Sequence, residues 1–411
     1  MSDKQCQIVL NGKSVSQELG ADLVSLMVIE NTNMATTLTM KLTTKPDDQG
    51  AWAYLDDARF DPFTKVSVKL GFASGGGLAA ALGAVASALS GGGGNDGLEP
   101  IFDGYITSVH LSLGSEPDEA HVEVSATDTS VLLSLEEKIH TWKDMSDSDI
   151  VEQIVGAYGV TVQADSTATV HQESDTTIAQ RGTDIQFVRE RAALNGLEFY
   201  FETDKNSGQI IGFFREPQLD GTPQSDLNIQ FGEQSNLRNF SARLVGQRPL
   251  NVKIEQLDVK ANGTNIGQAS DTQLNKLGAT DANGLVGGAL GSLLTPQDAQ
   301  AQMLVAGPPT SDATELQTIA QAVRDEAAWF ITAEGEINSD AYQAVLRPHR
   351  LVLVKGAGKP FSGKYYVTRV IHELKGDGTY TQRFHARRNA RDVDGSEKFG
   401  GSGLGLAIPS L

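Results

Sequence analysis

Two stretches decide the fold: Phe102-Asp-Gly-Tyr-Ile-Thr-Ser-Val-His110 and Phe361-Ser-Gly-Lys-Tyr-Tyr-Val-Thr-Arg-Val-Ile-His372. Each runs from Phe-x-Gly into an aromatic strand with Thr and His near its end. A proline, an alternating strand and a glycine turn precede each one, within residues 61–71 and 347–356. The spacing slips by a residue or two, as in a degenerate internal duplication. The sequence therefore predicts two related strand-rich domains.

Short runs with period-two alternation support this prediction at both ends of the chain. Such runs, bounded by turn formers, are typical of antiparallel strands in a barrel or sandwich. We expect strands at residues 7–10, 23–29, 37–42, 66–70, 105–110 and 121–125, and again at 350–354, 365–372 and 380–385.

The middle third changes to helical periodicity. Ser146-Asp-Ser-Asp149 and Thr183-Asp-Ile-Gln186 predict capping boxes at the starts of two helices, which Gly159 and Gly196 end. A strand at 197–202 and a Lys205-Asn-Ser-Gly208 hairpin turn follow. These elements predict a small α+β domain. A third helix is expected around 316–330, behind a Thr314-Glu-Leu-Gln317 cap.

The expected fold is mainly β with an α+β insert. It consists of a first barrel at 1–132, a middle domain at 133–235, a second barrel at 236–389 and a flexible C-terminal connector at 390–411. Insertions interrupt the barrels at 72–98, which is rich in Gly and Ala, and at 261–313, which is expected to be flexible.

Composition narrows the function. The 411 residues include 52 Asp and Glu against 33 Lys and Arg, and a net charge of -19 argues against a general binder of nucleic acid or anionic membranes. One cysteine, Cys6, excludes an internal disulfide and fits a reducing cytoplasm. The N-terminal stretch shows no secretory signal pattern, so we expect no export by the general route.

Within the first insertion, the stretch from Phe72 to Asn95 carries no charge, and eight of its 24 residues are glycine. A nucleotide loop would need a Rossmann context, which is missing, and a spanning helix needs about 20 mainly apolar residues. The remaining interpretations are a disordered loop or a flap that docks through an apolar face, formed by Leu78, Leu82, Val85 and Leu89.

No catalytic, cofactor or metal site is expected. His372-Glu373 lacks the second histidine of a zinc helix, and the other histidines have no ligand spacing. The acidic groups around Asp57 and Asp392 are interpreted as solvated turns. One basic cluster is a candidate partner contact: Arg383, Arg387, Arg388 and Arg391.

The chain resembles the hub proteins of contractile tails: the phage late control protein D family, phage baseplate hubs and the hub half of type VI secretion VgrG-like spike proteins. Three regions carry the resemblance: 102–128; 145–200, which includes Gln180-Arg-Gly-Thr-Asp-Ile-Gln-Phe-Val188; and 361–384. It implies a homotrimer whose six barrels form a pseudo-sixfold ring between a sixfold tail tube and a threefold spike.

The resemblance also implies the partners: tail tube protein, other baseplate proteins and cargo in the lumen. Because the sequence stops soon after Arg391, we expect the spike to be a separate protein, contacted through Leu404, Leu406, Ile408 and Leu411. A frayed terminus is the alternative. We expect synthesis in the bacterial cytoplasm and assembly into a phage tail or injection particle, without sequence-specific nucleic acid or a stable membrane span. A tail-tip cell-wall hydrolase and a soluble β-barrel ligand-binding module remain the alternative functions.

Overall fold

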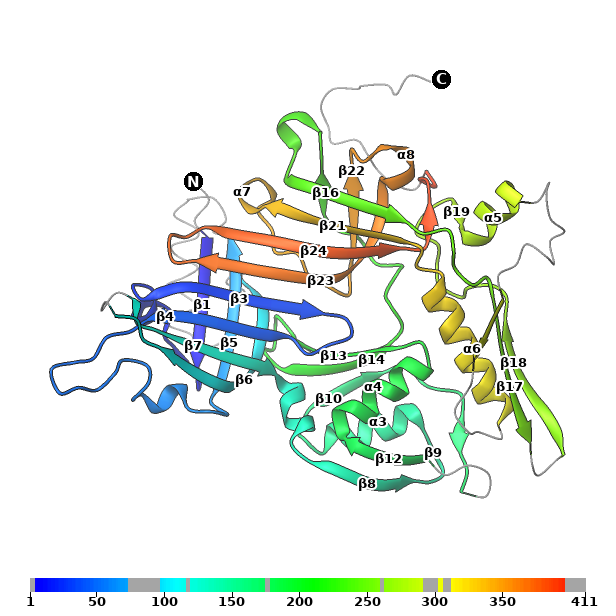
Figure 1. The fold of residues 1–411 in the computed structure, drawn as a ribbon, viewed down its shortest axis with the longest axis horizontal. Helices are drawn as coiled ribbons and strands as arrows, with labels where there is room; N and C mark the ends of the chain where they lie inside the picture. The colour runs from blue at the N-terminus through cyan, green and yellow to red at the C-terminus, as the bar shows by residue number, and fades with distance from the viewer. Residues whose placement is uncertain are drawn as a thin grey trace.

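The computed structural model describes residues 4–72, 97–115, 119–173, 178–258, 262–290, 302–305 and 312–395. One large sheet dominates it, with strand order β16-β21-β24-β23-β3-β4-β7-β6-β5-β1-β2 and with β22 and β15 branching from β23 (Figure 1). The predicted fold class is confirmed: the protein is mainly β, with an α+β insert.

The first barrel is built from strands of the N-terminal third. They are β1 (Lys4–Leu10), β2 (Lys13–Ser14), β3 (Leu23–Asn31), β4 (Thr37–Thr43), β5 (Lys65–Phe72), β6 (Glu99–Ser112) and β7 (His121–Asp128), with the short helix α1 (Ser16–Leu19). In β4 and β7 buried, mostly apolar residues alternate with partly exposed polar ones, because one face covers the core. β3 alternates in the same way, but its partly exposed positions include Met27 and Ile29. β1 and β5 cross the other strands steeply and close over that core (Figure 1).

The second barrel repeats this arrangement. Its strands are β15 (Gln224–Asn228), β16 (Leu237–Leu244), β21 (Ile331–Asn338), β22 (Leu351–Lys355), β23 (Gly363–Lys375) and β24 (Tyr380–Arg388). The order β3-β4-β7-β6-β5-β1 corresponds to β16-β21-β24-β23-β22-β15. One difference is that β15 pairs in parallel with β22, whereas β1 pairs antiparallel with β5.

Local irregularities recur at matching positions and support the duplication independently of strand order. The β6–β7 ladder skips Thr107 and the β23–β24 ladder skips Thr368, and each threonine hydroxyl donates to a facing carbonyl at 3.2 Å. Phe63 and His349 both have a left-handed backbone, and their amides donate to Ile106 and Val367. A shared bulge re-aims a strand in the same way in both barrels.

The middle domain packs two helices against a three-stranded sheet. It contains α3 (Asp147–Gly156), α4 (Asp184–Leu194), β10 (Thr161–Ala164), β13 (Glu198–Thr203) and β14 (Ile210–Arg215), together with the two-stranded pairs β8 (Glu137–Trp142) with β12 (Ile178–Thr183) and β9 (Met145–Ser146) with β11 (Val170–His171). Both predicted capping boxes are confirmed. β15, which the predicted boundary at 235 assigns to this domain, lies on the second barrel.

Two expectations for the last third need correction. The residues of 261–313 that the structure describes include β18 (Gly263–Ala269), α5 (Ala282–Leu290) and β20 (Gln302–Val305). β18 and β20 pair with β17 (Asn251–Asp258), and α6 (Ala313–Ala327) covers their sheet, so this part is ordered by packing. The α6 cap is Asp312, whose side chain accepts from the Thr314 amide, rather than Thr314.

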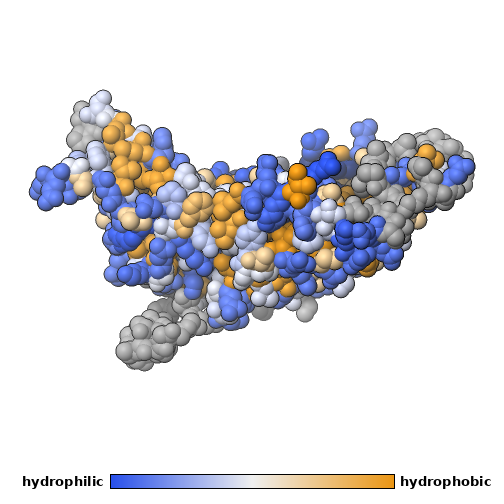
Figure 2. All heavy atoms as spheres, turned by 90° about the horizontal axis from the view of Figure 1, so that it is seen from below, coloured by the Kyte–Doolittle hydropathy of each residue, from blue (hydrophilic) through white to orange (hydrophobic). Residues whose placement is uncertain are grey.

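The outline of the molecule is elongated and hollowed along one side (Figure 2). Hydrophilic and hydrophobic residues are interspersed over the face that Figure 2 shows. In the part of the chain that the structure describes, no helix is long and apolar enough to cross a membrane.

Candidate functional site

The joint between the two barrels is the first candidate site. β23 of the second barrel pairs antiparallel with β3 of the first, so that the two barrels share one sheet. Leu26, Val28 and Val370 are fully buried there. The sequence predicted two barrels but gave no sign of this pairing, because a strand's partner depends on tertiary contacts.

A buried polar cluster fastens this joint. Glu30 of β3 accepts from Arg347 Nε at 3.0 Å and lies 2.9 Å from Nε2 of His372. Because Glu30 is an acceptor, Nε2 carries the proton and Nδ1 accepts from the Tyr380 hydroxyl at 2.7 Å. Burial raises the pKa of the Glu30 carboxyl, but Arg347 and His372 lower it more, so this pKa lies below its usual value.

This cluster has the residue types of an acid–base site but no room for a substrate. His372 is fully buried, and both of its ring nitrogens have protein partners. The space beside Glu30 and Arg347 measures about 20 Å³, enough for roughly one water molecule. A general base must reach the proton that it abstracts, so the geometry gives His372 a structural role.

A second buried carboxylate fastens the middle domain to the second barrel. Glu198 of β13 contacts His349 Nδ1 at 2.9 Å, the Tyr366 hydroxyl at 2.5 Å and Arg387 Nη2 at 3.3 Å. The ring of Tyr200 stacks on His349 at 3.4 Å between centroids. Burial raises the pKa of Glu198, but His349 and Arg387 lower it more, so the carboxylate stays ionised.

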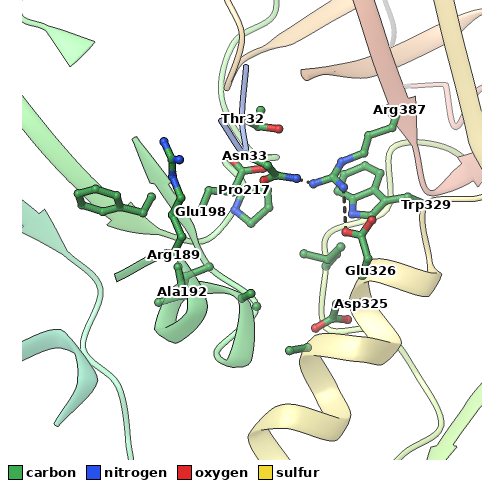
Figure 3. Close-up of a pocket in the computed structure, with 16 residues that line it drawn as sticks. Thr32, Asn33, Arg189, Ala192, Glu198, Pro217, Asp325, Glu326, Trp329 and Arg387 are labelled. Atoms are coloured by element: carbon green, nitrogen blue, oxygen red, sulfur yellow. Dashed lines mark hydrogen bonds and ion pairs between the residues drawn. The ribbon is translucent and has the colours of Figure 1, made fainter. Parts of the chain in front are cut away.

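A cavity of about 470 Å³ lies beside Glu198, where the β3–β4 loop, α4, α6 and β24 meet (Figure 3). Arg387 extends into it over the Trp329 ring, 4.3 Å from the ring centroid, and donates to Glu326 at 2.8 Å. Nε of Arg189 and Nε of Arg387 are buried without a hydrogen-bond partner in the structure. Ligand sites often occur at such domain junctions, so this is where a small ligand would bind.

The four arginines of the predicted basic contact do not form one surface. Arg383 is exposed, and Arg387 is paired with Glu198 and Glu326. Arg388 is fully buried and donates to the carbonyls of Leu277, Ser362 and Asp392. Strand alternation separates Arg388 from Arg383 and Arg387, because neighbouring residues of β24 point to opposite faces. Arg391 lies beyond β24 and pairs with Asp392 at 3.1 Å.

The other predicted residues are placed as follows. The candidate flap (Leu78, Leu82, Val85, Leu89) and the candidate spike contact (Leu404, Leu406, Ile408, Leu411) lie outside the described residues. Asp57 caps a 3-10 turn and binds Arg59, and Asp56 accepts from the Trp52 amide, as expected for turns. Among the described residues no group of three or more His, Cys, Asp or Glu is arranged to hold a metal.

The fold defines the class of protein that this chain resembles. A 43 kDa tail protein of prophage MuSo2 from Shewanella oneidensis has a TM-score of 0.59 at 11% identity, over 95% of this chain and 100% of that one. A tail protein from Neisseria meningitidis MC58 has a TM-score of 0.59 at 10% identity, over 94% and 96%. An E. coli type VI secretion component, described as similar to T4 bacteriophage tail proteins gp27 and gp5, has a TM-score of 0.51 at 14% identity, over 89% and 73%. The chain therefore has a fold found in tail proteins.

A family model described as the Alg8 N-terminal domain matches residues 91–376, and the chain belongs to that family. The description names neither a reaction nor an assembly, so it assigns no function. No curated protein matches the sequence.

Proposed function

We propose that the chain is a structural hub of a contractile tail or injection-machine baseplate. Three copies form a pseudo-sixfold ring that adapts a sixfold tail tube to a threefold, separate spike. The observation that carries this proposal is the duplicated barrel: two copies of one strand order share a sheet within a chain whose fold is that of tail proteins. Three chains would then supply six similar barrels in a closed ring.

The outer face of the shared sheet fits the wall of a channel. Its residues alternate with buried ones and are mostly polar, with Met27, Ile29 and Ile371 as partly exposed apolar residues at the joint. The charged members include basic residues (Lys41, Arg243, Arg369, Lys375, Arg383 and Arg387) and acidic residues (Glu123, Glu334, Glu336 and Glu373). Basic residues on this face are at least as numerous as acidic ones, although the whole chain has a net charge of -19, and we propose that cargo passes along it.

The test is to tag the N-terminus in the native host, sediment the lysate, and examine the tagged fraction by negative-stain electron microscopy and mass spectrometry. The hub proposal expects rod-shaped particles containing sheath, tube and a separate spike protein. Recovery of a small species without particles would contradict it.

The ligand-binding alternative is tied to the cavity beside Arg387 (Figure 3). Each of its two buried guanidinium Nε groups lacks an acceptor and would donate to a ligand oxygen, beside the lining carboxylates Glu198, Asp325 and Glu326. A thermal-shift screen of small carboxylates and phosphates checks this alternative, and a saturable rise in melting temperature that Arg189→Met abolishes would favour it.

A further inference from the structure

The two barrels are joined within the chain by one defined strand pairing. In the β23–β3 joint, Val370 lies opposite Glu30, His372 opposite Val28, and Leu374 opposite Leu26. The joint buries Val370, His372, Val28 and Leu26 completely and leaves Leu374 only 8% exposed. Because the barrels are duplicates, each has one strand equivalent to β23 and one equivalent to β3.

The equivalents of these two strands are β6 and β16. The bulges at Thr107 and Thr368 align Val109 with Val370, Leu111 with His372, and Leu113 with Leu374. The bulges after Leu23 and after Leu237 align Leu26 with Phe240, Val28 with Ala242, and Glu30 with Leu244.

Both equivalents have a free edge in the part of the chain that the structure describes. β5 pairs with β6 only as far as Tyr105, so residues 107–112 pair with β7 alone, and β16 pairs with β21 alone. The side chains there are incompletely covered: Leu113 is 55% exposed, and Val109, Leu111, Phe240 and Leu244 are half-buried. A free edge with apolar side chains is a site for pairing with another chain.

We propose that β6 of one copy pairs antiparallel with β16 of the next copy and thereby repeats the internal β23–β3 joint between chains. Val109 then lies opposite Leu244 of the neighbouring copy, Leu111 opposite its Ala242, and Leu113 opposite its Phe240. This inference rests on the proposed ring for the number of copies, which is three. The pairing is heterologous, so it propagates from copy to copy until the ring closes.

The side-chain pattern of the two edges is complementary. The three pairs above bring apolar residues together on the core side. Ser112 and Ser241 meet on the solvent side, where Glu373 and Met27 meet in the internal joint. A one-residue slip would turn the apolar set of one strand to solvent, so this alternation fixes the register.

The internal polar cluster explains why each edge chooses its own partner. Glu30 and His372 occupy the positions that Leu244 and Leu111 take in the joint between copies. If β6 paired with β3, Glu30 would lose its contact with His372, and a buried charge that loses a partner is costly. The polar pair therefore favours the β23–β3 pairing, and the apolar pair favours β6–β16.

Disulfide trapping in the full chain tests the inference. Ser112→Cys with Ser241→Cys, in a Cys6→Ser background, is oxidised in lysate of the native host and examined on a non-reducing denaturing gel. Facing residues of paired strands lie about 4.5–5.5 Å apart between Cα atoms, within reach of a disulfide. We expect a ladder that ends at a covalent trimer.

Two control pairs set the scale. Met27→Cys with Glu373→Cys is the equivalent pair inside one chain, and on oxidation it should lose its free thiols while the protein still migrates as a single chain on the gel. Ser112→Cys with Arg243→Cys is displaced by two residues and should link poorly. Suppose that the internal pair oxidises and native mass measurement gives trimers, but the cysteines at 112 and 241 do not link. The contact between copies then lies elsewhere, and only the β6–β16 pairing is overturned. If native mass measurement finds one copy of the chain per assembly instead of three, the ring proposal is overturned as well.

A charge substitution gives an independent measurement. Leu113→Glu should weaken self-association on the order of tenfold or more, because the pairing would bury an uncompensated charge. Leu135→Glu is the matched control, since Leu135 is 60% exposed in the middle domain and should leave association unchanged. Equal association of both variants would contradict the proposed edge.

Discussion

At the scale of single residues, buried charges hold the parts of the chain together. Arg347, Glu30 and His372 connect the two barrels, and Glu198 connects the middle domain to the second. A buried carboxylate is tolerated only where partners satisfy it, and each of these has at least two. The sequence alone could not predict these contacts, because the partners, such as Glu30 and His372, are far apart in the chain.

Removing one partner of the internal joint should destabilise the protein strongly. Arg347→Met leaves Glu30 buried with less compensation, and we expect the free energy of unfolding to fall by about 3 kcal/mol. Urea denaturation followed by tryptophan fluorescence measures this loss. Arg383→Met is the control, since Arg383 is exposed and its ion pair with Glu373 is long, at 3.7 Å. This substitution should lower the free energy of unfolding by less than about 0.5 kcal/mol. Equal losses would show that the cluster adds no stability.

The lowered pKa values of Glu30 and Glu198 predict acid sensitivity. A carboxyl whose folded pKa lies below its unfolded value stabilises the protein above the unfolded pKa and loses this effect as pH falls through the folded pKa. We therefore expect the urea concentration at the unfolding midpoint to decrease once the pH falls below about 4.3, the ordinary pKa of a Glu side chain.

Glu198→Gln isolates one contribution to this pH dependence. Glutamine cannot titrate, so the variant should be less stable at neutral pH but lose less of its remaining stability on acidification. Urea midpoints between pH 3 and pH 7 provide the comparison. A variant with the same slope as the wild type would exclude Glu198 as a source of the acid sensitivity.

At the scale of elements, local sequence was a reliable guide in the middle domain. Ser146 and Thr183 cap α3 and α4 as predicted, since a hydroxyl three residues before a carboxylate or amide satisfies helix amides locally. The α6 cap was misplaced by two residues, because Asp312 offers the same chemistry as Thr314. Local signals identify an element better than its boundary.

Loss of a cap should have a modest effect. Thr183→Ala removes the oxygen that accepts from the Gln186 amide, and we expect it to lower stability by about 1 kcal/mol. Thr161→Ala, at an exposed strand position, is the control and should stay within about 0.5 kcal/mol. Chemical denaturation of both variants gives the comparison, and a neutral Thr183→Ala would mean that water replaces the cap.

At the scale of the whole molecule, the first insertion is expected to be peripheral. Deletion of residues 74–94 leaves β5 and β6 and their pairing intact, so the chain should still fold and associate. We predict that retention of cargo or assembly of particles changes instead. Native mass measurement tests whether the deleted chain still associates, and mass spectrometry of purified particles tests whether cargo is retained. Failure of the deleted chain to fold would contradict a peripheral flap.

The sequence determined the local features: the alternating strands, the capped helices and the duplication, which depend on residues close together in the chain or on a repeated pattern. The tertiary structure decided the β23–β3 joint, the burial of Arg388 and the packing of the described residues within 261–313. These depend on which distant strand lies alongside, a choice set by the combined burial of residues hundreds of positions apart. The same reason hides the free edges of β6 and β16 in the sequence: an edge exists only relative to the rest of the sheet.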